Sequence, residues 1–229
     1  MQQVAAIPAY LHETYWWAYV HPKAVRLFER QWLVNLILWG NFAKLRDAAL
    51  EGLGKSLPGR TLQVACVYGD FTPRLAERVP GDASLDVVDV LPIQLANLRR
   101  KLPQAAQVNL VNRDAVDLGF ADATYERVVL FFLLHEMPLQ VRRRTLEEAI
   151  RVLKPGGQLV IVDYHRPAPW HPLRRVMQWI LRTFEPFAMD LWRHEVAEWL
   201  PSTARLLRKD TLYGGLYQKL VFSAGGASR

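Results

Sequence analysis

The chain has 229 residues, of which 51% are hydrophobic and 22% charged, a composition typical of a globular protein rather than a disordered one. We expect no membrane-spanning helix, because no apolar run reaches roughly 18 residues. We also expect no secretory signal, because residues 1–10 lack a basic segment followed by an apolar one. The single cysteine, Cys66, excludes an internal disulfide bond. These features predict a cytoplasmic protein.

The charge balance is basic, with a formal net charge of +7, and the chain holds eight tryptophans. Such a composition suits a nucleic-acid partner, an anionic membrane surface, or a basic enzyme with a tryptophan-rich core. The densest basic runs, Arg99–Lys101 and Arg142–Arg144, fall on predicted helices, where we interpret them as solvated faces. We therefore expect no nucleic-acid partner.

The N-terminal region, residues 1–57, is predicted to be helical and aromatic. Aromatic residues cluster between Tyr15 and Tyr19, and Ala24–Arg46 has helix-like apolar spacing with an apolar middle at Trp32–Trp39. Such a helix is either buried or lies in a membrane interface. We expect residues 1–57 to form a cap that faces substrate and membrane, and residues 58–229 to form an α/β domain in the same compact unit.

From residue 61 onward, predicted strands alternate with predicted helices, which indicates a parallel, doubly wound sheet. The run from Val128 to Leu134 is typical of a strand buried on both faces. The expected strands are Thr61–Cys66, Leu85–Val90, Val108–Val111, Arg127–Leu134 and Gln158–Asp163. The expected helices are Phe71–Val79, Pro92–Leu102 and Leu139–Val152, the last of them stopped by Pro155-Gly156-Gly157.

The pattern changes after Tyr164. Residues 166–172 read as a proline-rich loop, and Leu173–Phe184 and Arg193–Leu200 as helices. Ala204–Lys209 and Tyr217–Ser223 flank two glycines and predict an antiparallel hairpin. The whole pattern predicts a Rossmann-like, mostly parallel seven-stranded sheet with a C-terminal antiparallel hairpin.

Ligands of open α/β sheets bind at the carboxyl ends of the strands. Gly69 gives a tight turn after the first strand, and Asp89, about 20 residues later, is placed to accept ribose hydroxyls. Asp114, after the third strand, is placed to accept an adenine amine. Together with the predicted hairpin, this order of residues along the strand ends favours S-adenosylmethionine (SAM) as the cofactor over a nicotinamide. The predicted cofactor-binding residues are Gln63, Ala65, Val67, Tyr68, Gly69, Asp89, Val90, Asp114 and Ala115.

The loop after the first strand resembles that of class I methyltransferases but departs from it. Those proteins have an acidic residue that closes the strand and then a Gly-x-Gly-x-Gly turn. Here Gln63 stands at the acidic position, Ala65 and Val67 stand at the first two glycines, and only Gly69 is kept. The missing acid weakens the grip on the SAM ammonium group, so the loop either holds the methionine end differently or binds no cofactor.

Longer strings resemble a narrower family, the RquA proteins of rhodoquinone biosynthesis. These strings include "YWWAYVHP", "FERQWLVNLILWGNF", "VACVYGDFT", "LDVVDVLPIQLANLRRKL" and "VIVDYHRPAPWHPLR". The resemblance implies transfer of the amino group of SAM to ubiquinone, where it replaces a ring methoxy group, with manganese(II) required. Because an acid that clamps the SAM nitrogen as ammonium would block its attack, Gln63 fits this reaction.

Candidate catalytic and metal-binding residues follow from this resemblance, since manganese prefers oxygen ligands and tolerates imidazole. Tyr68 and Tyr164 are either proton donors or packing residues, and His135-Glu136 is either catalytic or a polar cap on its strand. No spacing selects among the ligands, and His165 and His171 are also suited to a structural loop role. The predicted catalytic residues are Tyr68, His135, Glu136 and Tyr164, and the predicted metal ligands are Asp114, Asp117, Glu136, Asp163 and His165, with His135 and His171 as further candidates.

Ubiquinone stays in the bilayer, so this function predicts a cytoplasmic enzyme held peripherally at the inner membrane. The N-terminal aromatic region and the basic helix at Leu173–Phe184 would contact lipid, or would simply cap the sheet. A conventional SAM-dependent quinone or small-molecule methyltransferase is the main alternative, and a non-catalytic scaffold or nucleic-acid binder is a third. The sequence leaves the oligomeric state open.

Overall fold

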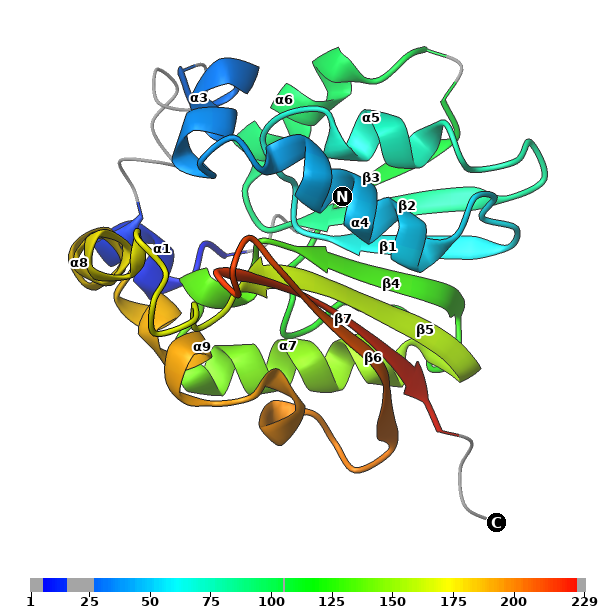
Figure 1. The fold of residues 1–229 in the computed structure, drawn as a ribbon. Helices are drawn as coiled ribbons and strands as arrows, with labels where there is room; N and C mark the ends of the chain where they lie inside the picture. Colours follow the sequence, from blue (N-terminus) through cyan, green and yellow to red (C-terminus); the bar gives the residue numbers. More distant parts are fainter. Residues whose placement is uncertain (1–5, 16–26, 105, 226–229) are drawn as a thin grey trace. The chain divides into compact units, whose positions relative to one another are not determined.

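The computed structural model describes residues 6–15, 27–104 and 106–225 (Figure 1). The aromatic residues predicted between Tyr15 and Tyr19 lie outside these ranges, except for Tyr15. So does the start of the predicted helix at Ala24. No helix within the described ranges combines the length and the apolarity needed to cross a membrane. The chain forms two compact units, Met1–Phe120 and Ala121–Arg229. Their strands are ordered β3-β2-β1-β4-β5-β7-β6 in one seven-stranded sheet, which confirms the predicted fold class.

The first unit holds three parallel strands, of which β1 and β2 are almost wholly buried, whereas only Val108 of β3 is buried. Thr61 of β1 is in register with Leu85 of β2, which in turn pairs with Val108 of β3. Pro92 begins a helix at the position where a missing N–H costs nothing. The elements are α1 (Ala9–Thr14), α3 (Gln31–Ile37), α4 (Phe42–Leu53), β1 (Arg60–Val64), α5 (Phe71–Ala76), β2 (Ser84–Asp89), α6 (Pro92–Lys101) and β3 (Val108–Asn112).

The second unit continues with one parallel pair and the antiparallel hairpin, and α7 covers one face of these strands (Figure 1). Val128–Leu130 and Leu159–Val162 are buried, and each such side chain stabilises the fold by about 1.5–3 kcal/mol. The elements are β4 (Tyr125–Phe131), the 3₁₀ turn η2 (Leu134–Glu136), α7 (Leu139–Arg151), β5 (Leu153–Tyr164), α8 (Arg174–Phe184), η3 (Pro186–Met189), α9 (Asp190–Arg193), η4 (Val196–Trp199), β6 (Ala204–Leu212) and β7 (Tyr217–Ala224).

The prediction of a single helix from Ala24 to Arg46 is wrong, because the structure has two helices there, α3 and α4, joined by a turn. Trp39 and Gly40 both have positive φ, at 53° and 76°. The amide of Asn41 donates hydrogen bonds to the carbonyls of Leu38 and Trp39, which satisfies oxygens that the end of α3 leaves open. A glycine followed by an asparagine is a helix-ending signal, but the surrounding apolar spacing hides it.

The predicted fourth strand extends too far. It ends at Phe131, because Phe132 adopts a φ of 54° and the chain turns into η2. The fifth strand starts earlier than predicted, at Leu153, and contains Pro155, Gly156 and Gly157, which were expected to stop the preceding helix. The predicted helix Arg193–Leu200 is two short turns, α9 and η4, and the predicted helix from Phe71 ends at Ala76 rather than at Val79.

Candidate active site

The loop that follows β1 keeps a glycine-like backbone at Ala65, although only Gly69 of the glycine pattern remains. Ala65, at the first glycine position of the methyltransferase pattern, has a φ of 68°. That conformation costs an alanine about 1 kcal/mol relative to glycine. Gly69 has a φ of 82°, and a Cβ there would lie 2.6 Å from Cζ of Phe42. The sequence change at Ala65 therefore preserves the shape of the loop at a cost in strain.

Gln63 is fully buried in β1 and turns its amide toward this loop. Its Nε2 donates a hydrogen bond to the carbonyl of Ala65 at 2.9 Å, and its Oε1 has no hydrogen-bond partner among the described residues. A buried acceptor without a partner costs about 1–3 kcal/mol. A donor from a ligand, such as the SAM amino group, would satisfy that oxygen.

Asp89 ends β2 and connects it to the same loop. Its Oδ2 accepts the N–H of Cys66 at 2.7 Å, and its Oδ1 accepts the N–H of Leu91 at 2.8 Å. Burial raises the pKa of this carboxyl to about 6, against the opposing effect of the two hydrogen bonds. Because each carboxylate oxygen can accept a second hydrogen bond, Asp89 fits a ribose diol. The unpaired Oε1 of Gln63 and the carboxylate of Asp89 therefore fit the amino and ribose groups of a bound SAM.

The remaining predicted cofactor residues lie nearby in the first unit. Asn112, which sequence reasoning missed, donates hydrogen bonds to the carbonyls of Asp89 and Val90. Asp114 is half-buried, and its Oδ1 accepts the N–H of Val116 at 3.1 Å. Its place after β3 is the one predicted for an adenine acceptor, and Ala115, also half-buried, follows it.

An ionic cluster, which no local sequence pattern indicates, stabilises the loop between β1 and α5, residues 65–70, which we call the cofactor loop. Oε1 of Glu29 lies 2.7 Å from Nζ of Lys101 and accepts the N–H of Gly69 at 3.2 Å. Lys101 also donates to the carbonyls of Gly69 and Val67. Asn97 donates to Oε2 of Glu29. The prediction that Lys101 belongs to a solvated face is therefore wrong, because its ammonium group holds the loop.

Tyr68 lies in the cofactor loop and is half-buried. Its hydroxyl accepts a hydrogen bond from Nε2 of Gln94 at 2.9 Å, and its ring stacks on Phe28 with centroids 5.9 Å apart. These contacts fix the ring, which is compatible with both predicted roles, proton donor and packing residue.

In the second unit, His135 and Asp163 form a buried pair. Asp163 lies near the end of β5, and its Oδ1 is 2.9 Å from Nδ1 of His135. The same carboxylate accepts the N–H groups of Leu134 and Tyr164, both at 2.8 Å. Burial lowers the pKa of His135, but Asp163 and the nearby Glu185 and Glu136 outweigh it and raise that pKa to about 9. The Asp163 carboxylate therefore favours the cationic form of His135.

Aromatic rings surround this pair. Tyr164 lies edge-on to His135 at 4.9 Å and to Phe132 at 5.4 Å, and Tyr217 lies 5.7 Å from Tyr164. Burial raises the pKa of Tyr164 and of Tyr217 well above the usual value, so both phenols stay protonated. The hydroxyl of Tyr217 is buried without a hydrogen-bond partner among the described residues. We call Phe132, His135, Tyr164 and Tyr217 the aromatic cluster.

The predicted metal ligands do not come together. Across the described ranges, no group of three or more His, Cys, Asp or Glu side chains is placed to hold a metal ion. The Asp163 carboxylate is bonded to the His135 ring and to three backbone N–H groups, and Nδ1 of His165 bonds to the carbonyl of Gly215. Asp114 and Asp117 face each other across a single β-bridge, and Nδ1 of His171 accepts the N–H of Leu173. Within the described part of the chain, these donors do not form a site that fits a manganese ion.

The second basic run also differs from its prediction. Arg142 is fully buried, and its guanidinium donates to the carbonyls of Leu134, Met137 and Phe187, each at 2.9 Å. It also stacks over the ring of Trp199 at 4.4 Å. Arg142 thus holds η2, the turn that carries His135, whereas Arg143 and Arg144 are exposed as expected.

A Rossmann-like sheet with an antiparallel hairpin, a strained loop after β1 and an acid that ends β2 define the fold of SAM-dependent methyltransferases. Comparison with known proteins agrees. Residues 61–157 match the methyltransferase domain family. An uncharacterized methyltransferase of Synechocystis, sll0829, is 30% identical over 154 residues, which cover 67% of this chain and 68% of that protein. The chain therefore belongs to the SAM-dependent methyltransferase family.

One further relative is similar in sequence, and one solved structure is similar in fold. A demethylmenaquinone methyltransferase of Listeria monocytogenes is 28% identical over 177 residues, which cover 73% of this chain and 74% of that protein. The N-methyltransferase NodS of Bradyrhizobium japonicum shares the fold, with a TM-score of 0.62 and 15% identity, over 80% of this chain and 96% of its own. Another structure of NodS contains S-adenosyl-L-homocysteine.

Proposed function

We propose that this methyltransferase-family protein transfers a group from SAM to a quinone or hydroquinone ring. The observation that carries the proposal is the aromatic cluster around the His135–Asp163 pair. Aromatic side chains suit the binding of a ring substrate. A buried imidazolium suits a ring oxygen, because a cation stabilises negative charge that develops on that oxygen where water is excluded. The relatives that are named demethylmenaquinone methyltransferases support the same class of acceptor.

Methyl transfer to a hydroquinone is the main candidate reaction. SAM supplies an electrophilic methyl group on its sulfonium sulfur. His135 would donate a hydrogen bond to a ring oxygen and stabilise it as an anion, which raises the electron density at the neighbouring ring carbon that accepts the methyl. As the carbon–methyl bond forms, the S–CH3 bond breaks and S-adenosyl-L-homocysteine leaves as a neutral thioether. The methylated carbon must then lose its proton, which restores the aromatic ring. Glu136, whose Oε1 lies 3.7 Å from Nε2 of His135, is a candidate base. Tyr164 and Tyr217, which stay protonated, would orient the ring.

Amino transfer to ubiquinone, which would give rhodoquinone, is a second candidate that a specific observation favours. Gln63 replaces the acid that normally clamps the SAM amino group, and its amide is already bonded to the carbonyl of Ala65. An amino group held by a neutral amide keeps access to its unprotonated, nucleophilic form. In this reaction His135 would donate its hydrogen bond to a quinone carbonyl, which makes the ring carbon that bears the methoxy group more electrophilic. The SAM nitrogen would add to that carbon, the methoxy group would leave as methanol, and the Cα–N bond of SAM would then break to release the aminoquinone.

Mass spectrometry of the product distinguishes the two reactions. Purified protein is incubated with SAM that carries heavy carbon in its methyl group and heavy nitrogen in its amino group. The acceptors are a short-chain ubiquinone and a short-chain demethylated hydroquinone. A product with the heavy methyl supports methyl transfer, and one with the heavy nitrogen supports amino transfer. If SAM binds but neither ring acquires label, the proposed acceptor class is wrong.

The role of Gln63 has a separate test. We expect Gln63→Glu to abolish amino transfer, because a carboxylate there would hold the SAM amino group as ammonium. The same substitution is expected to keep or strengthen SAM binding, measured by calorimetry. If Gln63→Glu leaves amino transfer at its full rate, the link between this residue and the reaction is refuted.

A further inference from the structure

Helix α8 presents an unusual face to solvent. Its inner side chains, Met177 and Leu181, are buried, whereas Trp179 is 63% exposed and Val176 lies beside it at 45%. Phe184, also exposed, lies edge-on to the Trp179 ring with centroids 6.2 Å apart. Leaving a tryptophan indole in water is unfavourable. A helix that buries one face and exposes Trp179 on the other is therefore suited to contact an apolar partner with its exposed face.

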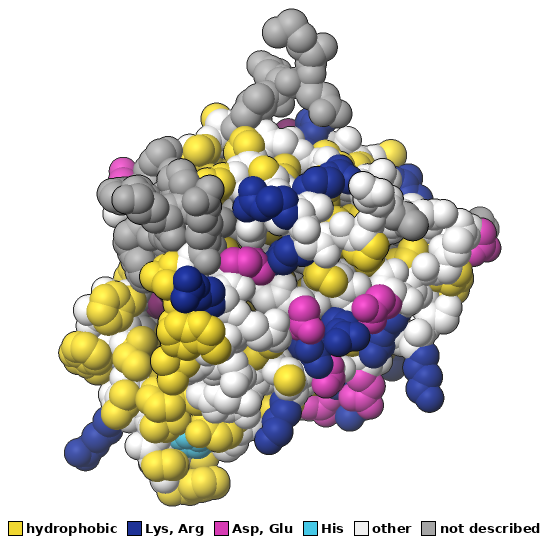
Figure 2. Space-filling view, turned by 90° about the horizontal axis from the view of Figure 1, so that it is seen from above, with side chains coloured by type: hydrophobic (Ala, Val, Ile, Leu, Met, Phe, Trp, Pro, Cys, Tyr) yellow, Lys and Arg dark blue, Asp and Glu magenta, His cyan; other side chains and the backbone are white. Residues whose placement is uncertain are grey.

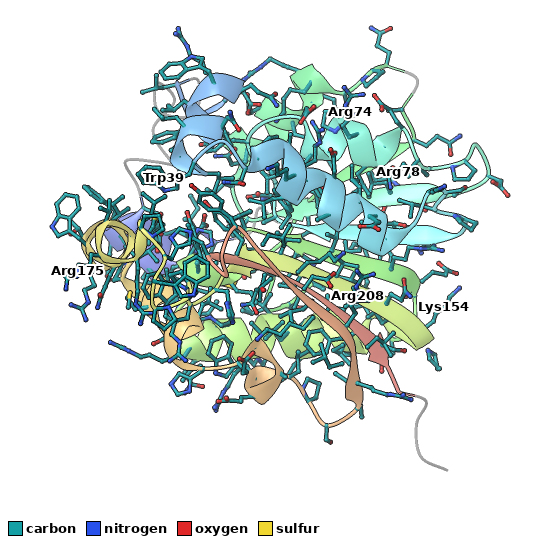
Figure 3. The ribbon with its side chains drawn as sticks, viewed as in Figure 1. Trp39, Arg74, Arg78, Lys154, Arg175 and Arg208 are labelled. Carbon is teal, nitrogen blue, oxygen red and sulfur yellow. The ribbon has the colours of Figure 1, made fainter. Side chains whose placement is uncertain are left out.

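Two arginines share this exposed face. Arg175 and Arg182 lie four residues before and three residues after Trp179, a spacing that puts all three on the same side of a helix. The structure gives neither guanidinium an ion pair with any described residue, whereas the adjacent Arg174 donates to the carbonyl of Pro167 at 2.8 Å. Figure 3 shows Arg175 at the outer side of α8, directed away from the helix.

A further exposed tryptophan lies close to the helix in the sequence. Trp170, in the loop before α8, is 77% exposed. The helix itself contains no acidic residue. In the space-filling view, hydrophobic side chains gather at the left, the side on which α8 lies in Figure 1, with Lys or Arg side chains beside them (Figure 2). We call Trp170, Arg175, Val176, Trp179, Arg182 and Phe184 the α8 face.

We propose that the α8 face binds the surface of a membrane that contains anionic phospholipids. Tryptophan favours the boundary between headgroups and acyl chains, and arginines beside it attract acidic headgroups. An amphipathic helix with this combination lies in the plane of the interface. A second copy of the chain is a poor occupant, because two such faces would bring Arg175 and Arg182 of each copy together without acids to neutralise them. The binding requires neither SAM nor a quinone.

The test is sedimentation of the full chain with vesicles. Vesicles of phosphatidylcholine alone are compared with vesicles that also contain phosphatidylglycerol, in the absence of SAM and quinone. We expect binding to the anionic vesicles that weakens as salt rises. Trp179→Gln, and separately the double variant Arg175→Gln with Arg182→Gln, are each expected to weaken binding about tenfold or more.

Matched controls come from the exposed strand β6 of the same unit. Leu207→Gln removes an exposed apolar side chain, and Arg205→Gln removes an exposed charge, and both are expected to keep full binding. Thermal unfolding of every variant verifies that it is folded. The proposal is overturned if the wild type does not sediment with anionic vesicles, if the β6 variants lose as much binding as the α8 variants, or if Trp179→Gln abolishes self-association instead of vesicle binding. Because no substrate is present, these outcomes do not depend on the proposed reaction.

Discussion

The chemistry of the second unit depends on one buried charge pair. Asp163 is fully buried, and its oxygens accept hydrogen bonds from the His135 ring and from three backbone N–H groups. Since these bonds orient the imidazole and keep it cationic, Asp163 acts as a positioning residue for His135. A His–Asp pair of this kind makes the stability of the protein depend on pH.

We expect the stability of the wild type to fall as pH rises through about 9. The folded pKa of His135, about 9, is above the usual 6.5, so its contribution is fully present below pH 6.5 and is lost as pH rises through the folded value. The loss is of order 3 kcal/mol, which urea unfolding at pH 6 and pH 9.5 would measure. We expect Asp163→Asn to cost about 3–5 kcal/mol at pH 6 and to lower the pKa of His135 seen by NMR. An unchanged pKa in the variant would contradict this view of the pair.

Ala65 provides a test of backbone strain at a single residue. We expect Ala65→Gly to stabilise the protein by about 0.5–1 kcal/mol, because glycine adopts a φ of 68° without steric cost, an advantage only partly offset by its greater freedom when unfolded. The matched control is Ala96→Gly on the exposed side of α6, which is expected to destabilise by about 1 kcal/mol. Chemical unfolding measures both. If the two substitutions shift stability in the same direction, the left-handed conformation of Ala65 is not strained.

At the scale of elements, Arg142 joins parts of the second unit that have little regular structure. Its three carbonyl acceptors belong to η2, to the residue after it and to η3, and its guanidinium stacks on a ring of η4. We expect Arg142→Lys to cost about 2–4 kcal/mol, because an ammonium group cannot reach all of these acceptors and leaves buried carbonyls unpaired. Arg143→Lys, one residue along the same helix and exposed, should change stability by less than about 0.5 kcal/mol. Equal effects in urea unfolding would refute the proposed role.

The order of strands and helices was predictable from sequence because it depends on local apolar periodicity. The strand at Leu85 and the helix from Pro92 were therefore predicted within one residue, and the strands of the hairpin within three. The breaks at Trp39 and Phe132 were not predicted, because a positive φ in a bulky residue is imposed by tertiary contacts such as the hydrogen bond from Leu134 to Asp163. The residue's own preference gives no sign of it.

Some residues of the candidate site could also be predicted from the sequence, and others could not. Asp89 and Gly69 could be located because the end of a strand is a local feature, and the structure finds both in the cofactor loop region. The brace made by Glu29 and Lys101 could not be located, because its partners are 72 positions apart and include backbone atoms that leave no trace in the sequence. The same holds for Arg142, whose charge suggested solvent but whose acceptors are carbonyls.

At the scale of the whole molecule, the first unit holds the residues suited to SAM and the second holds the aromatic cluster. Binding of SAM to the native chain alone must raise the stability of the folded state by mass action. At a ligand concentration of about 100 times Kd the gain is about 2.7 kcal/mol, which corresponds to a rise in Tm of roughly 5–10 °C for a chain of this size. This rise tests cofactor binding independently of any reaction.

We expect SAM and S-adenosyl-L-homocysteine both to raise the Tm in a thermal scan. Asp89→Asn should reduce the rise, because an amide presents one acceptor oxygen where the carboxylate presents two to the backbone and to ribose hydroxyls. Asp82→Asn, in an exposed turn before β2, is the matched control and should leave the rise unchanged. If neither ligand shifts the Tm of the wild type, the strained loop with Gln63 and Ala65 has lost cofactor binding, and the chain keeps the methyltransferase fold without its cofactor.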